Sequence, residues 1–139
     1  MIRDAIPSDF SLVLPLFKKV LDQSIFHALE YDESAMQRSF ATLSVFENGY
    51  ARLVELQDQV VGCLVGYVGK NQFGVLVAQD VFNFSKGDTH LLNKDFIRWA
   101  KAKGSVFVQV TDYSRQDSYG ELLACIGLKP ASVNYIGVL

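Results

Sequence analysis

The stretch from Phe73 to Val110 decides the fold, because an apolar strand, a short loop, an amphipathic helix and a second apolar strand follow there in order. The loop before the helix reads Asn83-Phe84-Ser85-Lys86-Gly87-Asp88-Thr89-His90. A glycine-containing turn that leads into a helix leaves backbone N–H groups at the positive end of the helix dipole. Such a turn can bind an anionic group such as a pyrophosphate, or it can be an ordinary loop with a helix cap.

The helix predicted after this loop spans Thr89 to Lys103 and has one apolar face. That face carries Leu92, Phe96, Trp99 and Ala100, and Gly104 follows as the C-terminal cap. Val106 to Val110 is nearly continuously apolar, which is typical of a central strand. A helix that connects two strands of one sheet makes them parallel through a right-handed crossover.

The rest of the chain predicts strands and helices on both sides of this unit. The predicted elements are a strand at Met1 to Asp4, a helix capped by Ser8 and containing Pro15, a helix capped by Asp32 and ended by Asn48-Gly49, an antiparallel meander of Tyr50 to Leu56, Val60 to Val68 and Phe73 to Phe82, a helix at Ser118 to Ile126, and a strand at Val133 to Val138. The sequence therefore predicts an α/β fold with a mixed sheet, in the order β-α-α-β-β-β-α-β-α-β, as one domain over residues 1–139.

Composition narrows the class of protein. Half of the 139 residues are apolar, with 10 Phe, 6 Tyr and 1 Trp, which is enough for a buried core. The net charge of −2 and the absence of like-charge blocks disfavour nucleic acid or a membrane surface as partners. No apolar run reaches the roughly 18 residues of a membrane span. Cys63 and Cys125 lie in apolar stretches, so we expect both in the core of a cytoplasmic protein.

Several short motifs, taken with the order of elements, carry a resemblance to a known family. They are Ile2-Arg3-Asp4-Ala5-Ile6-Pro7-Ser8-Asp9, Leu53 to Gly62, Ser85-Lys86-Gly87, Trp99 to Gly104, and Ile126-Gly127-Leu128. Together they resemble the GNAT superfamily of acyl-CoA-dependent N-acyltransferases, and Ala78-Gln79-Asp80 is similar to members encoded by bacteriophages. The resemblance implies acetyl-CoA as co-substrate, a small-molecule or peptide amine as acceptor, and a pantetheine arm between Val77 to Phe82 and Val106 to Val110.

The resemblance also implies which residues would bind the cofactor. They are Phe82, Phe84, Ser85, Lys86, Gly87, Asp88 and Thr89. The chain departs from the family pattern at Phe84 and Thr89, where Arg or Gln and Gly or Ala are usual, and Asp88 places negative charge near the expected pyrophosphate. Leu123 stands where the family has a tyrosine that protonates the leaving thiolate. These departures favour an alternative, a GNAT-fold protein without turnover that has a structural, assembly or regulatory role, for instance in a bacteriophage.

Acyl transfer to an amine needs a proton acceptor and a hydrogen-bond donor for the thioester oxygen. Asp80 is the candidate base, because a lone carboxylate in an apolar strand is partly desolvated and its pKa is raised. The alternative is that Asp80 faces solvent on a half-exposed strand. A bulged or splayed strand could supply the donor. Tyr113 and Tyr119 are candidate acids, or else ordinary surface rings.

The remaining ionisable residues carry weaker expectations. His27 and His90 have no spaced partners, so no metal site is predicted. Glu30, Asp32 and Glu33 are explained by a helix cap and a solvated face, and could alternatively floor an acceptor site for a cationic amine. The predicted last strand could pair with a second copy to form a homodimer.

Overall fold

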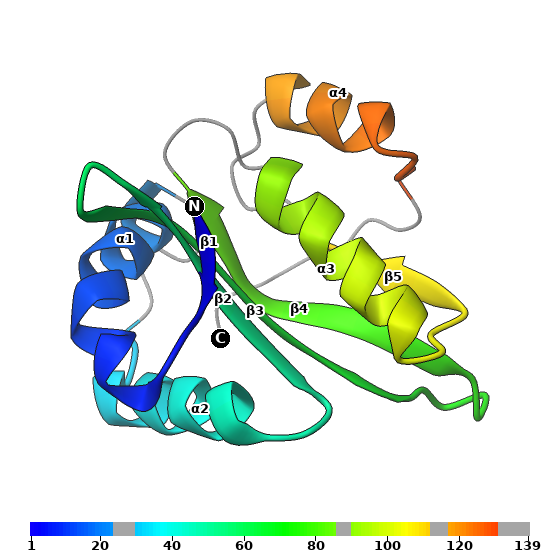
Figure 1. Ribbon diagram of the computed structural model, residues 1–139, viewed down its shortest axis with the longest axis horizontal. Helices are drawn as coiled ribbons and strands as arrows, with labels where there is room; N and C mark the ends of the chain where they lie inside the picture. The colour runs from blue at the N-terminus through cyan, green and yellow to red at the C-terminus, as the bar shows by residue number, and fades with distance from the viewer. Residues whose placement is uncertain (24–29, 86–89, 112–116, 131–139) are drawn as a thin grey trace.

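The computed structural model describes residues 1–23, 30–85, 90–111 and 117–130 (Figure 1). In chain order its elements are β1 (Ile2–Asp4), the 3-10 turn η1 (Pro7–Asp9), α1 (Phe10–Gln23), α2 (Glu33–Val45), β2 (Gly49–Leu56), β3 (Gln59–Lys70), β4 (Leu76–Ser85), α3 (His90–Ala102), β5 (Phe107–Gln109) and α4 (Asp117–Cys125). This confirms the predicted order as far as the last helix. The predicted strand Val133 to Val138 lies outside the described residues.

The described strands form one five-stranded mixed sheet in the order β1-β2-β3-β4-β5. Neighbours from β1 to β4 are antiparallel, and β5 is parallel to β4 after the crossover through α3, as predicted. Among the described strands β5 is an outer one and Phe107 is half exposed. The central position predicted for β5 stays a prediction, because the predicted last strand lies outside the described residues. None of the described helices is both long and apolar enough to cross a membrane.

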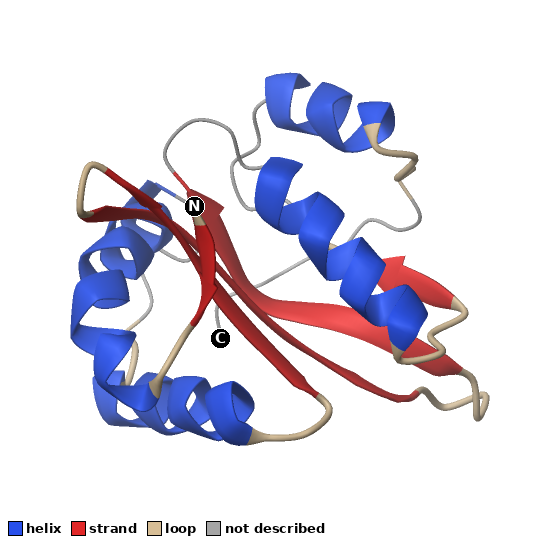
Figure 2. Ribbon diagram, viewed as in Figure 1, coloured by secondary structure: helices blue, strands red, loops and turns tan. Residues whose placement is uncertain are grey.

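Helices cover both faces of the sheet (Figure 2), and each face has its own core. On the face covered by α1 and α2, the α1/α2 face, aromatic rings dominate, with Phe17 packed on Phe82 and Phe84. On the face covered by α3, the α3 face, Tyr50 and Phe96 pack edge to face. The predicted inner face of α3 is confirmed, although Trp99 is only partly buried beside Phe96.

Of the two predicted helix N-caps, one differs from the structure and one is confirmed. Ser8 does not cap α1; instead the carboxylate of Asp9 accepts the Ile6 N–H at 2.9 Å and two bonds from the Arg3 guanidinium. The bonds from Arg3 lower the pKa of Asp9. The cap at Asp32 is confirmed, since its side chain accepts the Ala35 N–H at 3.1 Å.

Glycine ends α2 by close approach and not by a left-handed backbone. Gly49 is already the first residue of β2, and a Cβ there would overlap the carbonyl oxygen of Leu43. In the β3–β4 connection, Gly74 does adopt a positive φ of 73°. The Asn71 side chain accepts the N–H groups of Phe73 and Val75. This turn moves β4 to Leu76–Ser85, three residues beyond the prediction, and leaves Phe73 exposed.

The two cysteines have different environments. Cys63 lies in the α1/α2 core as expected, and burial raises the pKa of its thiol above the usual range. Cys125 lies at the end of α4 and is exposed. The prediction that Cys125 belongs to the core is therefore wrong, because the short helix α4 turns that position outward.

Candidate functional site

Strand β4 contains a bulge at Val81, and this bulge organises the site. Val65 pairs with Phe82 and Gly66 pairs with Asp80, so Val81 is an extra residue opposite β3. Ala78 packs in the α3 core and Phe82 packs on Phe17 on the opposite face. Side chains alternate along a regular strand, and the extra residue shifts that alternation by one. Asp80 and Asn83, three positions apart, therefore both lie on the α3 face.

Next to this bulge, β5 separates from β4. The two strands pair only from Val77 with Phe107 to Gln79 with Gln109. One residue further along β4, the link to the chain after β5 is made by a side chain and not by backbone pairing. The carboxylate of Asp80 accepts the N–H of Thr111 at 3.0 and 3.1 Å and the hydroxyl of Thr111 at 3.2 Å. The bulged strand that the sequence analysis considered is thus present, and a carboxylate bridges the point where the strands part.

The carboxyl group of Asp80 has a strongly perturbed environment. Only 5% of the residue is exposed, so the alternative that it faces solvent is wrong. Burial raises its pKa to about 6, while hydrogen bonds from Thr111 and Asn83 act in the opposite direction and stabilise the charged form. An acid with a pKa near neutrality, held at one position by neighbouring donors, can both accept and return a proton.

A buried pair of asparagines lies beside Asp80 and was missed from the sequence. The Asn83 amide donates to the side-chain oxygen of Asn93 at 2.9 Å, and both residues are buried. The bond joins the end of β4 to the first turn of α3, on either side of the loop that the resemblance assigns to a cofactor. Asn93 falls at helical spacing with Phe96 and Ala100, and a polar residue on that apolar face was the available signal.

The predicted cofactor residues divide into described and undescribed positions. Lys86, Gly87, Asp88 and Thr89 lie outside the described residues, as does the candidate acid Tyr113. Ser85 ends β4, and Tyr119 lies in α4. No side-chain position is described for either of them.

The two predicted phenylalanines lie away from the start of α3. The rings of Phe82 and Phe84 pack on Phe17, with centroids at 4.5 and 4.2 Å. Their side chains therefore belong to the α1/α2 face, and a ligand at the N-terminus of α3 could touch only their backbone. The bulge is the reason, because it turns both rings away from the face that carries Asp80.

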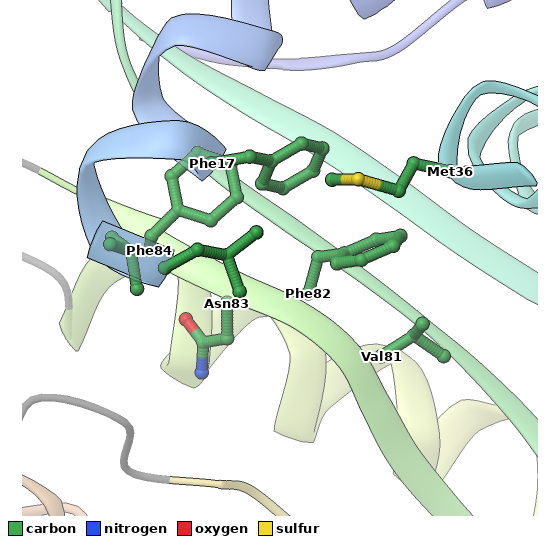
Figure 3. Close-up of a pocket in the computed structure, with 8 residues that line it drawn as sticks. Phe17, Met36, Val81, Phe82, Asn83 and Phe84 are labelled. Carbon is green, nitrogen blue, oxygen red and sulfur yellow. The ribbon is translucent and has the colours of Figure 1, made fainter. Parts of the chain in front are cut away.

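A cavity of about 220 Å³ lies on the α1/α2 face against the bulge (Figure 3). Its lining includes Phe17, Val20, Met36, Val81, Phe82 and Phe84. Figure 3 shows the Asn83 amide on the other side of β4 from the side chains of Phe17 and Met36. The site thus has a polar part on the α3 face and an apolar part on the α1/α2 face, joined at Val81.

Comparison with known proteins identifies the fold. No protein-family model matches the sequence, and no curated protein matches it. Solved structures do match over the whole chain. One is a ribosomal-protein-alanine N-acetyltransferase from Brucella melitensis biovar Abortus 2308, with a TM-score of 0.70, 12% identity, and coverage of 100% of this chain and 99% of that one. The chain has the GNAT fold.

Two further structures with this fold show how much its uses vary. An aminoglycoside acetyltransferase from an uncultured soil metagenomic sample has a TM-score of 0.67 and 16% identity, and covers 100% of this chain and 95% of that one. A transcriptional regulator from Bacillus halodurans C-125 has a TM-score of 0.75 and 16% identity, with coverage of 100% and 99%. At these identities the likeness establishes the fold and leaves the activity to be argued from the site.

Proposed function

We propose that this protein transfers an acetyl group from acetyl-CoA to an amine. The observation that carries the proposal is the buried carboxylate of Asp80, placed where β4 bulges and β5 parts from it. Acetyltransferases among the structures with the same fold support the general kind of activity. Acetyl-CoA, when bound, supplies the activated acetyl group and a thiolate that leaves readily.

The chain's own residues would act on the proton and on the carbonyl oxygen. As the N–C bond forms and the C–S bond breaks, the amine must lose a proton, and Asp80 is ionised to accept it above about pH 6. The extra peptide at Val81 lies outside the regular pairing of β3 and β4. An N–H group at such a bulge can donate to the thioester oxygen. Tyr113 and Tyr119 stay as predicted proton donors to the thiolate.

A specific observation favours the alternative of a GNAT-fold protein without turnover. Thr111 donates its N–H and its hydroxyl to Asp80, and these bonds hold the parted strands together at the point where a pantetheine arm would insert. Binding of acetyl-CoA there would have to displace Thr111 from the carboxylate. The absence of the usual tyrosine at position 123 points the same way, and a regulator is among the similar structures.

Calorimetric titration with acetyl-CoA, followed by free-thiol release against a panel of amines, separates these proposals. Binding with amine-dependent release is the expected result. Binding without release would support the silent alternative. If neither binding nor release is detected, acetyl-CoA is excluded as a ligand of this protein. Gly87→Glu should abolish binding, because a carboxylate at this turn repels pyrophosphate. Gln37→Glu, an equal charge change at an exposed position of α2, is the matched control.

A further inference from the structure

We infer that the cavity beside Val81 binds an apolar arm of the acceptor, so that the substrate class is primary amines carrying one aromatic or branched aliphatic group. The inference rests on the proposed function, because it identifies the cavity as the place of the amine in that reaction. It makes polycationic amines poor substrates, although an enzyme with the same fold acts on an aminoglycoside.

The chemistry of the lining excludes a site built for several positive charges. Among the residues that the structure describes, those that line the cavity include no charged side chain. The polar one is Asn83, whose amide donates to Asn93 on the opposite face of β4. Phe17, Met36 and Phe82 instead present rings and a thioether, which favour apolar groups through burial and close contact. A second ammonium group in this cavity would be desolvated with no charged partner among the described lining residues.

The size of the cavity sets the size of the arm. An apolar cavity of about 150 Å³ holds one benzene molecule. The cavity here, at about 220 Å³, has room for one ring and a short linker. Phe17 and Met36, which line the cavity, are held in place by the core of the α1/α2 face.

The cavity lies against the strand that carries the proposed base, on the other face of that strand. Val81 lines the cavity, and Asp80 is its neighbour in the chain, about 3.8 Å away between Cα atoms. The backbone pairing of β4 with β5 has already ended at Gln79. The Asp80 carboxylate lies on the α3 face and the cavity on the α1/α2 face, so an amine nitrogen beyond a ring in the cavity would reach the carboxylate through the gap where β4 and β5 no longer pair.

The acidic cluster before α2 does not change this assignment. The side chain of Asp32 caps α2, and Glu33 forms an exposed ion pair with Lys18 at 2.6 Å. Asp32 and Glu33 are therefore already paired, and none of Glu30, Asp32 and Glu33 is among the described residues that line the cavity. The expectation that this cluster could floor a site for a cationic amine is replaced by the apolar cavity on the same side of the sheet.

Thiol release with matched amines tests the inference. We expect kcat/KM at least tenfold higher for 2-phenylethylamine and 3-methylbutylamine than for spermidine and kanamycin. Met36→Phe should fill the cavity and raise KM for 2-phenylethylamine about tenfold, with a smaller change for methylamine, which has no arm. Met36→Leu keeps the volume and serves as the control. A preference for spermidine, or an equal loss for methylamine in Met36→Phe, would overturn the assignment.

Binding of 2-phenylethylamine without acetyl-CoA separates this inference from the proposed function. Calorimetry should detect binding of 2-phenylethylamine to the wild type and to Met36→Leu. Met36→Phe should bind it more weakly while having the same thermal stability as the wild type. Binding without any thiol release would keep the cavity and refute the transfer reaction. Release with other amines but no binding of 2-phenylethylamine would refute the cavity and keep the transfer reaction.

Discussion

Strand β4 contributes side chains of opposite chemistry to the two faces of the sheet. On the α1/α2 face, β4 contributes Phe82 and Phe84 to an aromatic core that leaves an apolar cavity. On the α3 face, the same strand contributes Asp80 and Asn83 to a buried polar cluster with Asn93 and Thr111. Burying polar groups is costly unless they bond to one another. The polar cluster meets this condition, because its members are hydrogen-bonded to one another.

The bulge at Val81 explains how one strand serves both faces. Without the extra residue, Asp80 and Asn83 would lie on opposite sides, three positions apart. With it, the two polar side chains share a face while Phe82 and Phe84 share the other. The lesson is that a single unpaired residue separates the polar and apolar parts of the proposed site and places them beside each other.

Core deletions on the two faces should give the largest effects. Phe40 on the α1/α2 face and Phe96 on the α3 face are both fully buried. Phe40→Ala and Phe96→Ala should each lower the free energy of unfolding by about 3–5 kcal/mol, measured by urea denaturation. Trp99→Ala should cost less, because Trp99 is only partly buried. A larger effect at Trp99 than at Phe96 would contradict the description of the α3 core.

Deletion of Val81 should separate activity from stability. The deletion leaves Phe82 paired with Val65 and Asp80 paired with Gly66, so both faces keep their side chains and the fold persists. The donor that the bulge offers to the thioester oxygen is lost, and one such donor contributes about 10²–10³ in rate. Thermal melting and thiol release measure the two effects. Val81→Ala keeps the extra residue and should lose far less activity; equal losses would remove the bulge from the mechanism.

The dependence of stability on pH should show the cost of burying Asp80. Because its folded pKa of about 6 lies above the unfolded value of 3.8, the folded protein holds this proton more tightly between those pH values. The free energy of unfolding should therefore fall as pH rises from 4 to 6, by about 2–3 kcal/mol from this group. Asp80→Asn should remove that component when both proteins are compared by denaturation at each pH. An identical dependence in the variant would show that Asp80 titrates normally.

Much of the fold could be predicted, because it follows from local patterns. The helical spacing of Leu92, Phe96 and Ala100 gave the buried face of α3, and the Asp32 cap is a short-range bond. The choice of Asp80 also followed from one strand, since a single carboxylate among apolar residues is a local feature. These predictions needed no knowledge of what the strands pair with.

The features that were missed depend on pairing across the sheet. The bulge at Val81 exists only relative to β3, and nothing in the strand itself marks it. The Asn83–Asn93 bond joins two elements across a loop. The direction of the Phe84 ring could not be predicted for the same reason, because the bulge decides which face it takes. The Ser8 cap failed because Arg3, on β1, holds Asp9 in the competing arrangement.

The most direct test of the proposed function is the pH dependence of acetyl-CoA thiol release with 2-phenylethylamine, for the wild type and Asp80→Asn. If Asp80 accepts the proton of the amine, the wild-type rate falls below a pH of about 6. The variant should lose most activity near neutral pH and less at high pH, where the amine loses its own proton. An equal loss at every pH, or no thiol release from the wild type, would contradict the assignment of Asp80 as the base of an acetyltransferase.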